Sequence, residues 1–99
     1  MSDALNRIAE CTGFQWGDGN STKNWYKHQV SRSETEEVFF NRPIRVAQGY
    51  ERSLDEDRYA ALGQTTEGRL LTVIFTIRGE QIRVISARPM GKRERRIYE

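Results

Sequence analysis

Residues 69–90, RLLTVIFTIRGEQIRVISARPM, decide the fold, because no other stretch of the chain is as rich in apolar and β-branched residues. In the first part, apolar residues recur at every second position, the period of a β-strand: Leu71, Val73, Phe75 and Ile77. A second strand-like run covers 82–88, after the short segment RGEQ. Two such runs joined by a glycine-containing turn predict a β-hairpin. Apolar residues on both faces are typical of central strands.

Four arginines lie on or at the ends of these strands: Arg69, Arg78, Arg83 and Arg88. A guanidinium on a strand that is covered on both faces raises the free energy of the fold unless it has a partner. The arginines therefore predict either carboxylate partners or a face of the sheet that receives an anion.

The composition is that of one small folded domain. The chain has 99 residues, 36% of them hydrophobic and 30% charged, and the apolar residues are clustered. The net charge is −3 over residues 1–57 and +5 over residues 58–99. A basic C-terminal half suits a polyanion such as RNA or DNA, or an acidic protein partner, and a solvated arginine-rich surface is the equal alternative.

Several classes of protein are excluded by the residues that the chain lacks. Cys11 is the only cysteine, so an intrachain disulfide is impossible and a cytoplasmic location is expected. The sequence has no apolar run long enough for a membrane span and no signal-peptide pattern. Without GxxxxGK[ST], HExxH, GxSxG or a Cys/His pair at metal spacing, we expect no nucleotide hydrolase, serine hydrolase, metal or cofactor.

The elements around the hairpin predict an α+β domain. Working outward, we expect a short edge strand at 14–16, a helix at 22–29, and a second helix that opens with a capping box of Ser33 and Glu36. A weak strand at 44–48, a surface loop at 49–57, a strand at 58–62 and a basic C-terminal helix at 91–98 complete the order. The sheet is expected to be antiparallel, with the two N-terminal helices packed on one face and the short C-terminal helix last.

The remaining polar residues suit RNA cleavage without a metal ion. His28 is the only histidine and follows Lys27, and an imidazole can act as a general base, although a lone histidine is more often a structural hydrogen-bonding group. Arginines can stabilise the charge of the phosphate in the transition state, and aromatic rings can stack on unpaired bases. The same residues would serve a nucleic-acid binder that catalyses nothing.

Several motifs, in order, resemble the BrnT family of toxins. FQW at 14–16 and NWYKHQV at 24–30 resemble the opening of the family, and DRYAALG at 57–63 and GRLL at 68–71 its middle. RVISAR at 83–88, followed by Glu94, Arg95 and Tyr98, resembles its ending. The resemblance covers 14–99 as one toxin domain and leaves 1–13 as an N-terminal extension. The chain departs from the family pattern at Gly17, where an acidic residue is usual, at Asn20, where lysine is usual, and at Arg52.

The resemblance implies a RelE-like fold and a ribonuclease toxin of a type II toxin–antitoxin system that cleaves RNA and inhibits translation. It implies neutralisation by a BrnA-type ribbon-helix-helix antitoxin, and contact with operator DNA only through the toxin–antitoxin complex. The alternative from a different class is a RelE-like module that binds nucleic acid or protein without catalysis.

Placed on these motifs, eight residues are the candidates for the site. The catalytic candidates are His28, Lys27, Arg83 and Arg88, and the RNA-binding candidates are Trp16, Arg58, Arg69 and Arg95. The structural alternative for Arg83 and Arg88 is an ion pair with Glu94 or with a loop carboxylate that holds the last helix, and for Arg69 it is a solvated position at a turn.

Overall fold

The computed structural model describes residues 3–17, 19–48 and 58–99, so the loop expected at 49–57 lies outside the described residues. The helices are α1 (Asp3–Ala9), α2 (Asn20–His28), α3 (Arg32–Phe40) and α4 (Lys92–Tyr98). The strands are β1 (Gly13–Trp16), β2 (Arg45–Gln48), β3 (Tyr59–Gln64), β4 (Leu70–Arg78) and β5 (Gln81–Pro89). No helix in the described part of the chain is long and apolar enough to cross a membrane.

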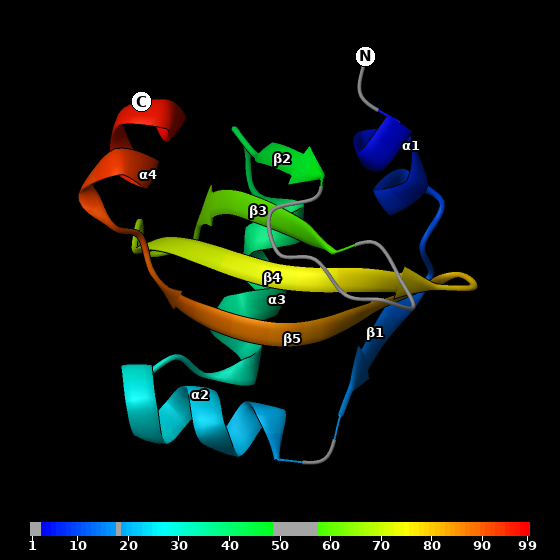
Figure 1. Ribbon diagram of the computed structural model, residues 1–99, viewed down its shortest axis with the longest axis horizontal. Coiled ribbons are helices and arrows are strands. Elements are labelled where there is room, and N and C mark those ends of the chain that lie inside the picture. The colour runs from blue at the N-terminus through cyan, green and yellow to red at the C-terminus, as the bar shows by residue number, and fades with distance from the viewer. Residues whose placement is uncertain (1–2, 18, 49–57) are drawn as a thin grey trace.

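The five strands form one sheet in the order β1-β5-β4-β3-β2 (Figure 1). The expected hairpin is β4 and β5, and with β3 it forms an antiparallel meander of the three C-terminal strands, which β2 extends by one more antiparallel strand. The edge strand β1 is also confirmed, and it pairs parallel with β5 through Gly13 to Trp16. The α+β class is therefore confirmed.

The main core lies between the sheet and α3. In Figure 1 this helix lies behind β3, β4 and β5. Val38 and Phe39 of α3 are buried against strand residues that include Phe75 and Val73. Strand β3 runs two residues beyond its predicted end, through Gly63 and Gln64. A Cβ on Gly63 would lie 2.8 Å from Cγ1 of Val38. This glycine allows α3 to pack directly on the strand.

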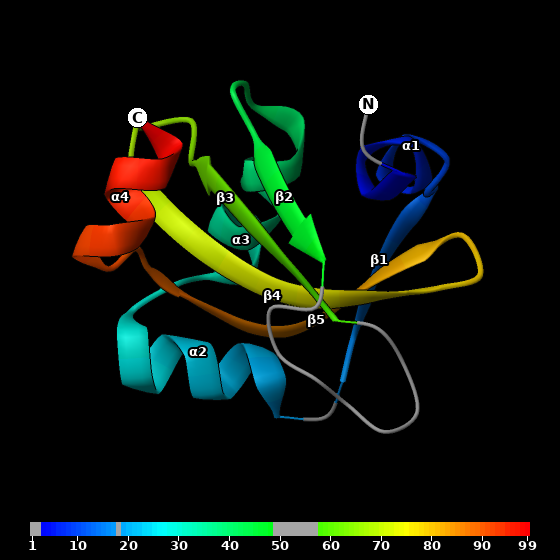
Figure 2. The same cartoon turned by 45° about the horizontal axis from the view of Figure 1, so that its top comes forward.

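The second helix, α2, lies along the edge of β5 and not on the face of the sheet, as Figures 1 and 2 both show. Strand β1 pairs only with the first half of β5, which leaves backbone groups of the second half without a strand partner. Two asparagines one helical turn apart bind this edge: Asn20 Nδ2 donates to the Val84 carbonyl (3.0 Å), and the Ala87 N–H donates to Asn24 Oδ1 (3.2 Å). Helix α2 thus replaces a strand at this edge.

Helix α3 begins two residues earlier than its predicted capping box. Ser31 is the N-cap, its side chain accepts from the Glu34 N–H (3.1 Å), and Glu34 Oε1 accepts from the Ser31 N–H (3.0 Å). The predicted box of Ser33 and Glu36 is wrong, although both pairs have the same Ser-x-x-Glu spacing. The earlier start buries Thr35, Val38 and Phe39 on one helical face.

Helix α4 packs on the face of the sheet opposite α3. Tyr98 forms a small second core with Leu62 and Met90, and its hydroxyl donates to the Pro43 carbonyl (2.7 Å). Burial raises the pKa of the Tyr98 hydroxyl and outweighs the opposing effect of the Arg45 charge. The C-terminal helix is therefore a fixed part of the fold.

Candidate functional site

A β-bulge in β5 brings two of the candidate arginines to the same face of the sheet. Five positions separate Arg83 from Arg88, and strict alternation would place them on opposite faces. The register shifts between Ile74 and Phe75, so that Ile85 has no cross-strand partner, Arg83 pairs with Thr76 and Arg88 pairs with Thr72. Both arginines therefore lie on the side of the sheet opposite α3, here called the arginine face.

Arg83 lies near the middle of β5 and is half-buried. Among the described residues, the structure gives its guanidinium no hydrogen bond and no ion pair. Its Nη2 atom lies beside Gly17, where an added Cβ would be only 2.7 Å away, and Gln15 is its neighbour on β1. The side chain amide oxygen of Gln15 is buried without a partner in the described part of the chain. The guanidinium is thus positioned by packing and not by a carboxylate.

Arg88 has the structural role that was the alternative from the sequence. Its Nη1 and Nη2 atoms donate to both carboxylate oxygens of Glu94 at 2.7 and 2.8 Å. The Glu94 side chain is only 8% exposed, and it also accepts from the Gly91 N–H (2.8 Å), which caps α4. Bidentate geometry at a buried carboxylate makes this a strong pair. Arg88 therefore tethers α4 to the sheet.

Arg69 also has a structural role, and the solvated position at a turn that was its alternative is wrong. Its guanidinium donates to the carbonyls of His28 (2.9 Å) and Gln29 (2.7 Å) and pairs with Glu34 at 3.1 Å. These carbonyls are the free acceptors at the C-terminal end of α2, which favour a cation. Burial opposes ionisation of Glu34, but hydrogen bonds from Ser31 and Arg69 outweigh it and lower the pKa of this carboxyl. Arg69 joins α2 to α3.

Trp16 lies on the face of the sheet opposite the arginine face, because it pairs with Val84 while Gln15 pairs with Arg83. Its indole Nε1 donates to Glu36 Oε2 (3.0 Å), and the Arg32 guanidinium lies over the ring, 5.1 Å from its centroid. The structure therefore separates Trp16 from Arg83 and Arg88 and joins it to α3.

Lys27 and His28 lie in the last turn of α2. His28 is one turn beyond Asn24, which contacts Ala87, so it lies alongside the end of β5 that carries Arg88. Ser21, which accepts from Arg32, marks the side of α2 that faces α3. By helical geometry Lys27 lies on the other side, toward the arginine face. The structure thus brings Lys27 to the edge of that face, whereas His28, seven residues after Ser21, lies on the side of α2 that faces α3.

Arg58 and Arg95 flank the same region. Arg58 directly precedes β3, and since Tyr59 faces the main core, alternation directs Arg58 to the arginine face. Arg95 is exposed on α4, next to the buried Glu94. Sequence reasoning missed Arg45 on β2, whose cross-strand partner Leu62 also lies on this side. The sequence alone gives no signal for Arg45, because the face on which it lies depends on the register of β2.

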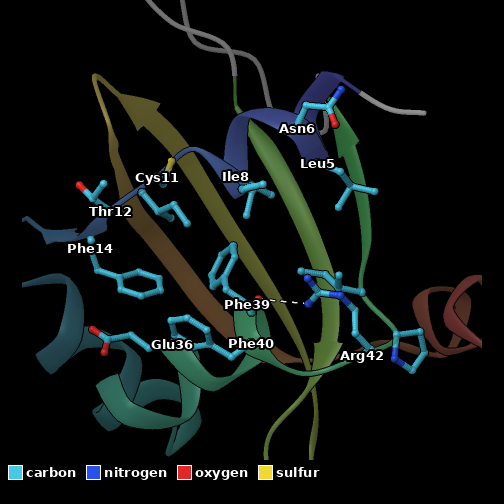
Figure 3. A pocket seen from close by; sticks show the side chains of 15 residues that line it. Leu5, Asn6, Ile8, Cys11, Thr12, Phe14, Glu36, Phe39, Phe40 and Arg42 are labelled. Atoms are coloured by element: carbon cyan, nitrogen blue, oxygen red, sulfur yellow. Dashed lines mark hydrogen bonds between the residues drawn. The ribbon is translucent and has the colours of Figure 1, made fainter.

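An open cavity of about 990 Å³ lies on the opposite side of the molecule, between α1 and α3 (Figure 3). Its walls are mostly apolar and include Leu5, Ile8, Phe14 and Phe40. Burial raises the pKa of the Cys11 thiol, which lines this cavity, and outweighs the opposing effect of the Arg7 charge. Within the described ranges, no three His, Cys, Asp or Glu side chains are grouped as a metal site requires.

Comparisons with known proteins identify the family. A family model described as the ribonuclease toxin BrnT of type II toxin–antitoxin systems matches residues 16–94. Among solved structures, the chain is similar to the 1.1 Å crystal structure of the Brucella abortus ribonuclease toxin, BrnT, with a TM-score of 0.62 and 23% sequence identity over 82% of this chain and 99% of that chain. The comparison with curated proteins returned no match. Since the family model covers most of the sequence, the chain belongs to the BrnT family of ribonuclease toxins from type II toxin–antitoxin systems.

Proposed function

We propose that the chain is an endoribonuclease toxin that cleaves RNA at the arginine face by attack of a 2′-hydroxyl, without a metal ion. In this reaction the 2′-oxygen forms a bond to the adjacent phosphorus while the bond from phosphorus to the 5′-oxygen breaks. The 2′-hydroxyl loses a proton to a base and the 5′-oxygen gains one from an acid. The products are a 2′,3′-cyclic phosphate and a 5′-hydroxyl end.

The observation that carries the proposal is the contrast between Arg83 and two other candidate arginines, Arg69 and Arg88. Arg69 and Arg88 have carboxylate partners, whereas Arg83 has none among the described residues. A guanidinium that is half-buried and not neutralised favours an anion, and it matches the two oxygens of a phosphate. We therefore assign Arg83 to the phosphate whose negative charge increases in the transition state.

His28 is our candidate for the base, and Lys27 for a second cation. Both lie in the last turn of α2, at the edge of β5. Along the helix, about 12 Å separate His28 from Asn20, which lies close to Gly17 and hence to Arg83. Both side chains must act at one phosphate, so in this proposal the RNA lies along β5 and the His28 imidazole reaches across this separation toward the phosphate at Arg83. In this account Arg88 acts indirectly, by holding α4.

The proposal includes the inhibitory partner and the cellular setting. We infer that a BrnA-type ribbon-helix-helix antitoxin covers the arginine face with acidic side chains, since such a partner must compensate the charge that RNA would meet. Contact with operator DNA then requires the toxin–antitoxin complex. The substrate implies action in the cytoplasm and inhibition of translation.

Purified protein incubated with single-stranded RNA in excess EDTA tests the chemistry. We expect cleavage to persist and the new ends to be 2′,3′-cyclic phosphate and 5′-hydroxyl. Arg83→Ala should lower the cleavage rate at least a hundredfold, and His28→Ala should lower it as well, while both variants remain folded. Folded wild-type protein that binds RNA without cleaving it would contradict the proposal and favour the non-catalytic binding module.

A further inference from the structure

We propose that Tyr26, between Lys23 and Lys27, is a stacking platform for one unpaired base of the RNA. The inference rests on the proposed function and identifies a residue that sets where RNA lies on α2. It starts from exposure: Tyr26 is 77% exposed, among the most exposed large hydrophobic side chains in the described part of the chain.

The three side chains form one stripe on α2. Residues at i, i+3 and i+4 are neighbours on a helix surface, which is the spacing of Lys23, Tyr26 and Lys27. All three are exposed, and the stripe lies on the side of α2 away from Ser21 and α3. Arg83 also lies on the side of the sheet opposite α3, so the stripe and the arginine face the same side of the molecule.

The charge of α2 decides which partner suits this stripe. The sequence of the helix, NSTKNWYKH, contains no carboxylate, and its first turn has no acidic residue. The structure gives the Tyr26 ring no aromatic, cation–π or hydrogen-bond partner among the described residues. An uncovered ring beside two cations matches the two parts of a nucleotide, because the base stacks on the ring and the phosphates bind the lysines. Single-stranded RNA fits both parts.

The adjacent helix carries an equally exposed aromatic residue in a different setting. Phe40 of α3 is exposed to almost the same extent, 75%, but its ring lies 6.0 Å from the ring of Phe14 at the apolar cavity. It therefore lies away from the arginine face and has no pair of lysines beside it. Phe40 is a matched control for an exposed aromatic residue that lies outside the proposed RNA path.

Binding of a fluorescent oligonucleotide tests the platform without requiring catalysis. A single-stranded RNA about twelve nucleotides long, with 2′-O-methyl groups throughout, cannot be cleaved, because it has no free 2′-hydroxyl. We expect Tyr26→Leu to bind it about tenfold more weakly, Tyr26→Phe to bind within about twofold of wild type, and Phe40→Leu to bind as wild type. Wild-type affinity in Tyr26→Leu would overturn the proposal, and so would equal losses in Tyr26→Leu and Tyr26→Phe.

A scan with single abasic nucleotides identifies the stacked base. In the wild-type protein, one abasic position should lower affinity about tenfold, and in Tyr26→Leu the same position should have no further effect. Independent, additive losses would contradict stacking at Tyr26. Cleavage of unmodified RNA by Arg83→Ala separates this inference from the proposed function. Loss of cleavage in Arg83→Ala beside wild-type oligonucleotide binding in Tyr26→Leu would refute the platform alone.

Discussion

Arg83 and Arg88 lie on the same strand and the same face of the sheet, yet the structure uses them differently. Arg88 makes two hydrogen bonds to the buried carboxylate of Glu94, and this pair holds α4. Arg83 lies beside Gly17 and has no carboxylate within the described part of the chain. A charge that is neutralised inside the protein contributes to folding, and one that is not is available to a ligand. On one strand, therefore, Arg88 stabilises the fold and Arg83 is available to bind a ligand.

The largest effect on stability is expected from Arg88→Ala. The variant leaves the buried Glu94 carboxylate without its guanidinium, which should lower the free energy of unfolding by about 3 kcal/mol. Urea denaturation followed by circular dichroism measures the change, and Arg93→Ala, an exposed arginine on the same helix, is the control. An unfolding midpoint equal to wild type in Arg88→Ala would show that the pair of Arg88 and Glu94 does not stabilise the fold.

Gly17→Asp should give Arg83 a carboxylate partner, as Glu94 is for Arg88. A Cβ at this position lies 2.7 Å from Arg83 Nη2, so the new carboxylate would meet the guanidinium directly. We expect RNA cleavage to fall at least tenfold with no loss of stability, since the ion pair competes with the phosphate. Gly17→Ala moves the guanidinium without adding charge and should reduce cleavage less. Equal rates in Gly17→Asp and wild type would show that Arg83 is not the phosphate ligand.

A smaller, pH-dependent effect is expected at Arg69. Arg69→Ala should cost about 1 kcal/mol near pH 7, because the pair with Glu34 is partly exposed. The pKa of Glu34 is lowered in the folded protein, so the stabilisation is complete above the ordinary pKa of 4.5 and is lost as the pH falls through the folded value. The difference in unfolding free energy between wild type and Arg69→Ala should therefore shrink in acid. A constant difference from pH 7 to pH 3 would assign the effect to the two carbonyl contacts instead.

Local patterns predicted the sheet because alternation and turn residues are short-range signals. The hairpin of β4 and β5 follows from a two-residue period on either side of Gly79, and β1 from two aromatic residues one apart. The start of α3 could not be decided this way, since Ser31–Glu34 and Ser33–Glu36 have the same spacing. The choice depends on burial of Val38 and on Arg69, which is distant in the sequence.

The site was less predictable because its geometry depends on one bulge and on long-range partners. Ile85 resembles any other strand residue in the sequence, yet its bulge sets the face on which Arg83 lies. Trp16 was expected at the RNA, but its partners Glu36 and Arg32 come from α3 on the opposite face. Glu94 was foreseen as a partner of Arg88, because the two lie close in the sequence.

The most direct test of the account measures unfolding and RNA cleavage together in Arg83→Ala, with Arg88→Ala beside it. Because Arg83 has no described partner to lose, Arg83→Ala should unfold within about 0.5 kcal/mol of wild type. It should nevertheless lose cleavage, and the salt dependence of its RNA affinity should fall by about 0.7 in logarithmic slope. Arg88→Ala should show the large loss of stability. Wild-type cleavage by a stable Arg83→Ala protein, or a loss of stability equal to that of Arg88→Ala, would contradict the account.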